Sequence, residues 1–211
     1  MLKLVRHGQS LANTAEFDPQ RQGDYRAPLT AIGRAQARAA GHAVGASFLE
    51  GALVYGSPYL RAQQTLEEIL DATDGRRLAQ GVYEDPRLRE VDHGYADVKG
   101  QGELRERHGW FYYRYDGGES PADCFDRVSG FLETLMRQVE RRRAERVVVV
   151  THGLALRCFL MRFLHLTVSE FEAIENPGNG AVVTVGPRET IQDPVLEKGR
   201  WRVHGLTFRT C

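Results

Sequence analysis

The residues of this sequence best suited to chemistry are two histidines that each stand before a glycine, near the end of an apolar run. His7 follows the run Leu2–Val5, and Gly8 after it lets another group approach closely. A neutral imidazole is a competent nucleophile near pH 7 when a backbone carbonyl holds its other ring nitrogen protonated. Arg6 beside it offers a planar, permanently charged fork that matches the oxygens of a phosphate. The pair is therefore suited to attack on phosphorus.

Three further side chains would complete such a site. His152 comes just after the four valines Val147–Val150, Arg61 lies within Ser57–Thr65, and Glu90 lies between them in the sequence. Taken singly, they would be a core histidine, a solvated helix arginine and a surface carboxylate. Taken together, they supply cations for the phosphoryl oxygens and a carboxyl group for the departing oxygen. Because phosphoryl transfer depends mainly on positioning and on neutralising charge, the set favours that chemistry.

The elements that must position these residues alternate between strands and helices. Apolar runs predict strands at Leu2–Val5, Leu53–Tyr55, Val147–Val150, Ala181–Val185 and Trp201–Phe208. Caps and helical spacing predict helices from Thr30 to about Phe48, from Ser57-Pro58 to about Ala72, from Ser120-Pro121 to about Arg143, and from about Leu154 to Leu164. This alternation predicts an α/β fold, a three-layer α/β/α sandwich with a mostly parallel central sheet. In such sheets ligands bind beyond the carboxyl ends of the strands, where both histidine-glycine turns fall.

The composition is that of an average globular protein and argues against several classes. The chain has 211 residues, and its 28 Lys plus Arg balance 28 Asp plus Glu, so no basic excess indicates a nucleic-acid binder. No apolar run approaches the ~20 residues needed to cross a bilayer. Met1–Arg6 leads straight into the first motif, so we expect no cleaved signal peptide there. The three widely spaced cysteines, Cys124, Cys158 and Cys211, are typical of reduced thiols in a cytoplasmic protein.

In type and order, these motifs resemble those of the histidine phosphatase superfamily, the fold that also contains the cofactor-dependent phosphoglycerate mutases. The matching segments are Arg6–Ser10 with Asn13, Pro28–Gly33 with Gln36-Ala37, Ser57–Thr65, Leu88–Glu90, Gly117–Ser120 and Thr151–Gly153. No single segment is decisive, but the ordered series is specific. The resemblance implies a phosphoglycerate mutase-like fold.

The resemblance also implies a role for each matching residue. His7 would attack phosphorus and become a phosphohistidine, and Glu90 would protonate the departing oxygen and then deprotonate the water that releases phosphate. The residues expected around the transferred group are Arg6, Arg61, His152 and Asn13, with Gly153 beside them. Because Glu90 must begin as an acid, we expect its surroundings to favour the protonated form and the activity to peak on the acidic side of neutrality.

The segment Arg105–Tyr115 is similar to the stretch before the same Gly-Gly-Glu-Ser motif in fructose-2,6-bisphosphatase domains, where tyrosines and arginines grip a sugar phosphate. It implies a lid or substrate-binding insertion around residues 92–120 of a single domain, 1–211, with Arg114 and Tyr115 on the substrate. Arginines here would suit a second acidic group. The alternative is an aromatic ridge that only packs a lid onto the core, since aromatic side chains mostly bury area.

Fewer than thirty residues separate Glu90 from Gly117, where the mutases carry a considerably longer insertion. A shorter cover admits water more easily, so we expect an acid-phosphatase-like phosphohydrolase acting on small phosphorylated metabolites, without a cofactor or metal. Zinc is disfavoured because Asp92 and His93 near Glu90 do not give the usual ligand spacing. A phosphoglycerate mutase and a silent member that binds a phospholigand or partner are the alternatives. A homodimer stays open.

Overall fold

The computed structural model describes residues 1–14, 17–73, 78, 81–94 and 100–209. Its strands are β1 Leu2–Arg6, β2 Ala52–Gly56, β3 Val82–Glu84, β4 Arg146–Thr151, β5 Val182–Pro187, β6 Leu196–Lys198 and β7 Trp201–His204. Its α-helices are α1 Pro19–Gln22, α2 Ala31–Val44, α3 Ala46–Glu50, α4 Leu60–Asp71, α5 Gly102–His108, α6 Pro121–Arg142, α7 Gly153–Leu164 and α8 Val168–Ala173. Over these ranges, no helix is both long and apolar enough to cross a membrane.

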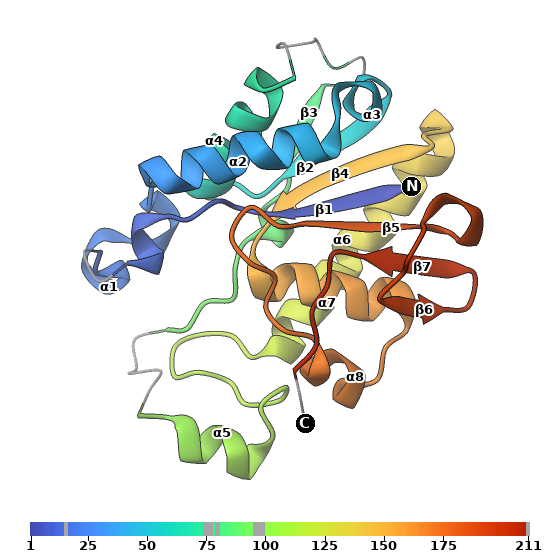
Figure 1. Cartoon of the computed structure of the whole chain (residues 1–211). Helices are drawn as coiled ribbons and strands as arrows, with labels where there is room; N and C mark the ends of the chain where they lie inside the picture. Colours follow the sequence, from blue (N-terminus) through green and yellow to red (C-terminus); the bar gives the residue numbers. More distant parts are fainter. Residues whose placement is uncertain (15–16, 74–77, 79–80, 95–99, 210–211) are drawn as a thin grey trace.

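The strands form one sheet in the order β3-β2-β4-β1-β5-β7-β6, placed between two helical layers. Neighbours from β3 to β1 run parallel, whereas β5, β7 and β6 extend the sheet through antiparallel pairs. Figure 1 shows α2, α3 and α4 over one face and α6, α7 and α8 over the other. The predicted three-layer α/β/α sandwich is confirmed. Its parallel half carries both histidine-glycine turns.

Strand β4 shows why a run of four valines predicts a strand covered on both faces. Val147 and Val149 belong to the core that lies against α6 and α7, whereas Val148 and Val150 belong to the core against α2 and α4. Side chains alternate across a strand, so each pair enters a different layer. Burying each of them contributes roughly 1.5 kcal/mol or more. The run therefore anchors the strand that ends at the second histidine.

Three predicted boundaries are wrong, each for a local reason. The first predicted helix breaks at Gly45, whose φ of +83° leaves the helical region, so α2 and α3 are separate helices. The helix predicted from Ser57 begins at Leu60, because Tyr59, with a ψ of 135°, is still extended and takes the N-cap position. The last strand ends at His204, where Gly205 with a φ of +87° turns the chain.

The start of α2 packs directly against the backbone of the first histidine-glycine turn. Thr30 caps this helix as predicted, accepting a hydrogen bond from the Gly33 N–H at 3.0 Å. A Cβ on Gly33 would lie 1.9 Å from the Gln9 carbonyl oxygen, and a Cβ on Gly8 would lie 2.2 Å from the Gly33 carbonyl oxygen. Both contacts are with backbone, so the two glycines fix the distance between α2 and the turn that carries His7.

We predict that Gly33→Ala lowers the free energy of unfolding by about 3 kcal/mol, because the added methyl group must push α2 away from the turn. Gly102→Ala is the matched control, since its Cβ would meet no atom within 4 Å and its φ is not positive. It should change the free energy of unfolding by less than about 1 kcal/mol, because alanine suits a helix at least as well as glycine. Urea unfolding measures both values, and NMR should show the His7 ring signals shifted in the first variant alone. Equal losses would mean that the glycine contact does not limit the packing.

Candidate active site

The register of the parallel strands brings the two histidine-glycine turns together. Arg6 at the end of β1 lies opposite Thr151 at the end of β4, and the His7 N–H donates to the Thr151 carbonyl oxygen at 2.9 Å. The rings of His7 and His152 consequently meet edge to face, with centroids 5.0 Å apart. Strand β2 pairs with the other side of β4, so Ser57, which follows β2, reaches the same edge of the sheet.

His7 presents one ring nitrogen that carries no hydrogen. Its Nδ1 lies 2.7 Å from the Gly8 carbonyl oxygen, which can only accept, so Nδ1 holds the proton and Nε2 keeps its lone pair. Burial lowers the pKa of His7 to about 3, and the charges of Arg61 and Arg6 act in the same direction, against the hydrogen bond to Gly8. The ring is neutral at physiological pH and has the form that a nucleophile requires.

His152 is fully buried, and its Nδ1 has no partner among the described residues. Its Nε2 lies 2.7 Å from the Ser57 Oγ, which also accepts a hydrogen bond from the Tyr59 N–H at 3.3 Å. A hydroxyl has one hydrogen and two lone pairs, so Ser57 can donate to Nε2 while it accepts from Tyr59. In that arrangement the His152 proton lies on Nδ1, which can donate to an oxyanion.

The two predicted arginines flank these rings. Arg6 donates through Nη1 to the Pro177 carbonyl oxygen at 2.5 Å, and its Nε is buried without a partner in the described chain. Arg61 is 3% exposed, and its guanidinium lies 4.9 Å from the centre of the Tyr59 ring. Burial is the main cause that lowers the pKa of both histidines, and the charge of Arg61 is the next. The Tyr59 ring under this guanidinium meets the His152 ring edge-on at 5.1 Å.

Asn13 lies at the rim of the site with its amide oriented by neighbours. Its Oδ1 accepts hydrogen bonds from the Ser10 N–H at 3.0 Å and from the Asn179 Nδ2 at 3.2 Å, which leaves its own Nδ2 as a donor. Asn179 also donates to the His7 carbonyl oxygen at 3.2 Å. The sequence reasoning missed Asn179, because an asparagine in a Pro-Gly-Asn-Gly segment predicts a turn and nothing more.

Glu90 lies at the start of α7, the helix that His152 caps. Its carboxylate accepts hydrogen bonds from the N–H groups of Val91 at 3.0 Å, Leu154 at 3.4 Å and Ala155 at 3.3 Å. These contacts tie the carboxyl group to the N-terminal end of α7. The predicted acid therefore lies beside His152, the residue that precedes α7.

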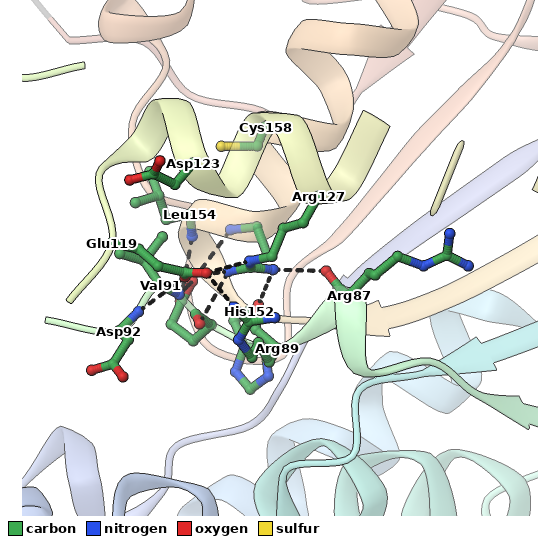
Figure 2. A network of polar contacts seen from close by, with 12 residues as sticks. Arg87, Arg89, Val91, Asp92, Glu119, Asp123, Arg127, His152, Leu154 and Cys158 are labelled. Atoms are coloured by element: carbon green, nitrogen blue, oxygen red, sulfur yellow. Dashed lines mark hydrogen bonds and ion pairs between the residues drawn. The ribbon is translucent and has the colours of Figure 1, made fainter. Parts of the chain in front are cut away.

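A clamp on the backbone holds Glu90 in this place. Arg127 donates to the carbonyl oxygens of Arg87 at 2.7 Å, Arg89 at 2.9 Å and Glu90 at 3.1 Å. Figure 2 shows Glu119 in the middle of the network, bound to Arg127 and Arg89 and to the N–H of Asp92. Glu119 was part of a matching motif, but Arg127 reads as an ordinary helix arginine, so the clamp was not predicted.

The other predicted substrate residues are placed as follows. Gly153 is the first residue of α7, and its missing side chain leaves room for the Asn176 amide, whose oxygen lies 2.5 Å from where a Cβ would be. Arg114 is 67% exposed and forms an ion pair with Asp123 on α6. Tyr115 is buried, with its ring edge-on to that of Tyr113 in the same segment. In the described chain, neither of these two side chains forms a hydrogen bond or ring contact with the histidines, arginines or glutamate of the site.

The segment Arg105–Tyr115 packs onto the body of the protein through its aromatic side chains. Trp110 stacks on Phe171 of α8 with ring centroids 5.7 Å apart, and Phe111 meets the same ring edge-on at 5.3 Å. The packing role that was the alternative for this segment is therefore present. It does not exclude substrate contacts by the arginines of the same segment.

No group of three His, Cys, Asp or Glu side chains that could hold a metal ion occurs in the part of the chain described. Cys124 and Cys158, predicted to be reduced, are free thiols buried in the core. The positive charge beside the two imidazoles comes from arginine side chains. These arginines, with the imidazole N–H of His152, form a setting that can hold a small anion against the free Nε2 of His7.

Comparison with known proteins identifies the family. The model of the histidine phosphatase superfamily (branch 1) matches residues 2–196. The chain belongs to the histidine phosphatase superfamily. The match covers every residue of the convergent site and confirms the resemblance drawn from the motifs.

Two relatives of this chain carry names of different kinds. It is similar to the phosphoglycerate mutase-like protein AT74 of Arabidopsis thaliana, with 40% identity over 197 residues that cover 85% of this chain and 62% of that protein. It is also similar to the broad-range acid phosphatase DET1 of Saccharomyces cerevisiae, with 33% identity over 202 residues that cover 67% of this chain and 60% of that protein. The chain thus spans about three fifths of the length of each relative. A mycobacterial glucosyl-3-phosphoglycerate phosphatase shares the fold, with a TM-score of 0.72 over 96% of both chains at 24% identity.

We predict that stability falls as the pH is lowered from about 6.5 towards 3, because the unfolded chain protonates its histidines near 6.5 while burial keeps His7 neutral down to about 3. The contribution of neutral His7 to stability is complete above the histidine pKa of the unfolded chain, and it is lost progressively as the pH falls below that value. His7→Gln removes one such group and should reduce the slope by about 1.4 kcal/mol per pH unit between pH 6 and 4. Urea unfolding at several pH values measures the slope, with the exposed His42→Gln as control. The same slope in both variants would contradict the prediction.

Proposed function

We propose that this histidine phosphatase is an acid-phosphatase-like phosphohydrolase that removes a phosphoryl group from small acidic metabolites through a phosphohistidine on His7. One observation carries the proposal. A neutral, buried imidazole with a free Nε2 stands beside a second imidazole and two guanidinium groups. The Nε of Arg6 and the Nδ1 of His152 have no acceptor in the described chain, and buried donors without acceptors are costly. A phosphoryl group with three oxygens would satisfy both.

The reaction would proceed in two displacements at phosphorus. In the first, the Nε2 of His7 bonds to phosphorus while the bond from phosphorus to the leaving oxygen breaks, and Glu90 gives its proton to that oxygen. In the second, water attacks phosphorus, Glu90 takes a proton from it, and the N–P bond breaks to release inorganic phosphate. The groups that neutralise the phosphoryl oxygens are Arg6, Arg61, His152 and Asn13.

Two points support hydrolysis over phosphoryl transfer back to a substrate. The segment between Glu90 and Gly117 is short compared with that of the mutases, so water reaches the intermediate more easily. One relative of this chain is named a broad-range acid phosphatase. A phosphoglycerate mutase stays the alternative, because another relative is named mutase-like.

Positive charge around the Trp110 ring supports a substrate that carries more than one acidic group. The guanidinium carbons of Arg105, Arg157 and Arg209 lie 5.7, 4.9 and 5.8 Å from the Trp110 ring. The Nε atoms of Arg105 and Arg157 are buried without a partner in the described residues. Burial, and then the nearby charge of Arg209, lower the pKa of Arg157 to about 10. A second acidic group would be held here more readily than by Arg114, which is already paired.

The remaining predictions fit within this proposal. Catalysis needs neither metal nor cofactor, because two arginines and one histidine neutralise the phosphoryl oxygens. The chain acts as one domain, 1–211, with residues 92–120 as its substrate-binding insertion, and works in the cytoplasm on a small molecule without nucleic acid or membrane. A silent member would keep the same donors and bind a phospholigand without turnover.

We predict that His7→Ala lowers the rate of para-nitrophenyl phosphate hydrolysis by more than about a thousandfold, because the variant lacks the nucleophile. Rapid-quench with the unaltered protein should trap an acid-labile phosphoryl group on His7. Equal rates for both proteins would end the proposal. Interconversion of 2- and 3-phosphoglycerate without release of inorganic phosphate would favour the mutase. Tight phosphate binding with no turnover across a broad panel would favour the silent member.

We predict that Glu90→Gln affects substrates according to their leaving group. An alkyl phosphate needs a proton on the departing oxygen, so its kcat should fall by about a hundredfold or more. Para-nitrophenolate leaves without protonation, so formation of the intermediate from its phosphate should be reduced far less. Single-turnover kinetics on both substrates measure the difference, with the exposed Glu103→Gln as control. Equal losses on the two substrates would remove Glu90 from the role of acid.

A further inference from the structure

Arg61 has a partner that the sequence analysis did not identify. Asp24 lies in the one-turn helix Asp24–Arg26, and both terminal nitrogens of Arg61 bind it. Nη1 donates to the Asp24 Oδ1 at 3.0 Å and to the Asp24 carbonyl oxygen at 2.7 Å, and Nη2 donates to Oδ2 at 2.8 Å. The Arg61 side chain is 4% exposed and that of Asp24 is 36% exposed. A carboxylate with access to solvent thus grips a buried cation.

The planar geometry of the Arg61 guanidinium shows which of its N–H donors Asp24 leaves free for a ligand. An arginine carries five N–H donors in one rigid plane: one on Nε and two on each terminal nitrogen. Asp24 occupies both hydrogens of Nη1 and one hydrogen of Nη2. The two that remain are the Nε–H and the second Nη2–H, which lie side by side on one edge and point the same way. This edge is the fork that binds two oxygens of one phosphate.

The body of the protein holds Arg61 against the imidazoles from the other sides. Its guanidinium lies over Tyr59, whose ring meets the His152 ring edge-on at 5.1 Å. The Thr65 hydroxyl donates to the Arg61 carbonyl oxygen at 2.7 Å and accepts from the Gly8 N–H at 3.0 Å. The backbone of Arg61 is thereby tied to the turn that carries the nucleophile. Asp24 is the contact that sets the rotation of the fork within this frame.

We propose that Asp24 is a positioning residue that fixes Arg61 so that its Nε–Nη2 edge faces the phosphoryl group. The inference rests on the proposed function in one respect, that the anion is the phosphoryl group attacked by His7. Asp24 binds the opposite edge of the guanidinium, formed by Nη1 and Nη2, and is open to solvent. Its negative charge is therefore screened from that anion. Without Asp24 the guanidinium would rotate, and its bidentate contact with two phosphoryl oxygens would be lost.

An alternative interpretation of the contact between Arg61 and Asp24 predicts the opposite change in anion binding when Asp24 is removed. If Asp24 stood where the phosphoryl oxygens must bind, it would compete with substrate, and its removal would strengthen anion binding. If Asp24 positions the fork, its removal weakens anion binding. The sign of the change therefore separates the two.

The test measures vanadate and inorganic phosphate binding by calorimetry, beside kcat and KM with para-nitrophenyl phosphate. We expect Asp24→Ala to weaken vanadate binding by about tenfold and to lower kcat/KM by about ten- to a hundredfold, since misplacing one contact costs on this scale. Asp24→Asn keeps one acceptor oxygen, so its affinity for vanadate should lie between those of the unaltered protein and Asp24→Ala. Asp18→Ala is the matched control, since Asp18 lies in the same segment and pairs with the exposed Arg21. It should bind vanadate as the unaltered protein does.

A second comparison separates positioning from general support of the fold. In an Arg61→Ala background, Asp24→Ala should cause no further loss of vanadate binding, because its effect passes through Arg61. A further loss equal to that of the single variant, or unchanged or tighter vanadate binding in Asp24→Ala, would overturn the inference. Urea unfolding confirms that each variant is folded. Anion binding is measured without turnover. The positioning role of Asp24 can therefore be disproved while His7 remains the nucleophile, and His7 can be shown not to be the nucleophile while Asp24 still positions Arg61.

Discussion

The parallel pairing of β1 with β4 is the constraint on which the site depends. Because Arg6 lies opposite Thr151, the two chain segments leave the sheet at the same level, and the histidines that follow meet as neighbours. A shift of one residue in this register would turn every side chain of one strand to the other face. The valines that bury β4 in both cores prevent such a shift. The energy that fixes the two imidazoles therefore comes from the hydrophobic layers, far from the chemistry.

Electrostatics at the site follow from that burial. Imidazoles enclosed next to arginines stay neutral, because a proton on either ring would add a further positive charge to a region that excludes water. The backbone carbonyl of Gly8 holds the His7 proton on Nδ1, so this ring offers a lone pair, and the hydroxyl of Ser57 can donate to the Nε2 of His152, so that the second ring offers an N–H. The same surroundings that suppress protonation create a strong preference for an anion.

Groups outside the reacting set hold each member in place. Arg127 and Glu119 clamp the backbone around Glu90, and Asp24 binds the outer edge of Arg61. Gly33 lets α2 approach the turn of the nucleophile. These contacts all join segments distant in the chain. They explain how a site assembled from separate loops can be rigid enough for phosphoryl transfer, in which positioning carries most of the effect.

The sequence by itself determined the layers of the fold, the two strands that lead into the histidine-glycine turns and the identity of the convergent residues, because buried strands, caps and ordered motifs are encoded by local pattern and spacing. It also pointed to a backbone carbonyl on the nucleophile. It misassigned Ser57 as a helix cap, and it had no signal for Asn179, Arg127 or Asp24. Such partners are decided only in the tertiary structure, since a hydrogen bond between residues far apart leaves no periodicity in the chain. Which nitrogen of His152 carries a proton, and which edge of Arg61 stays free, depend on neighbours that only folding brings together.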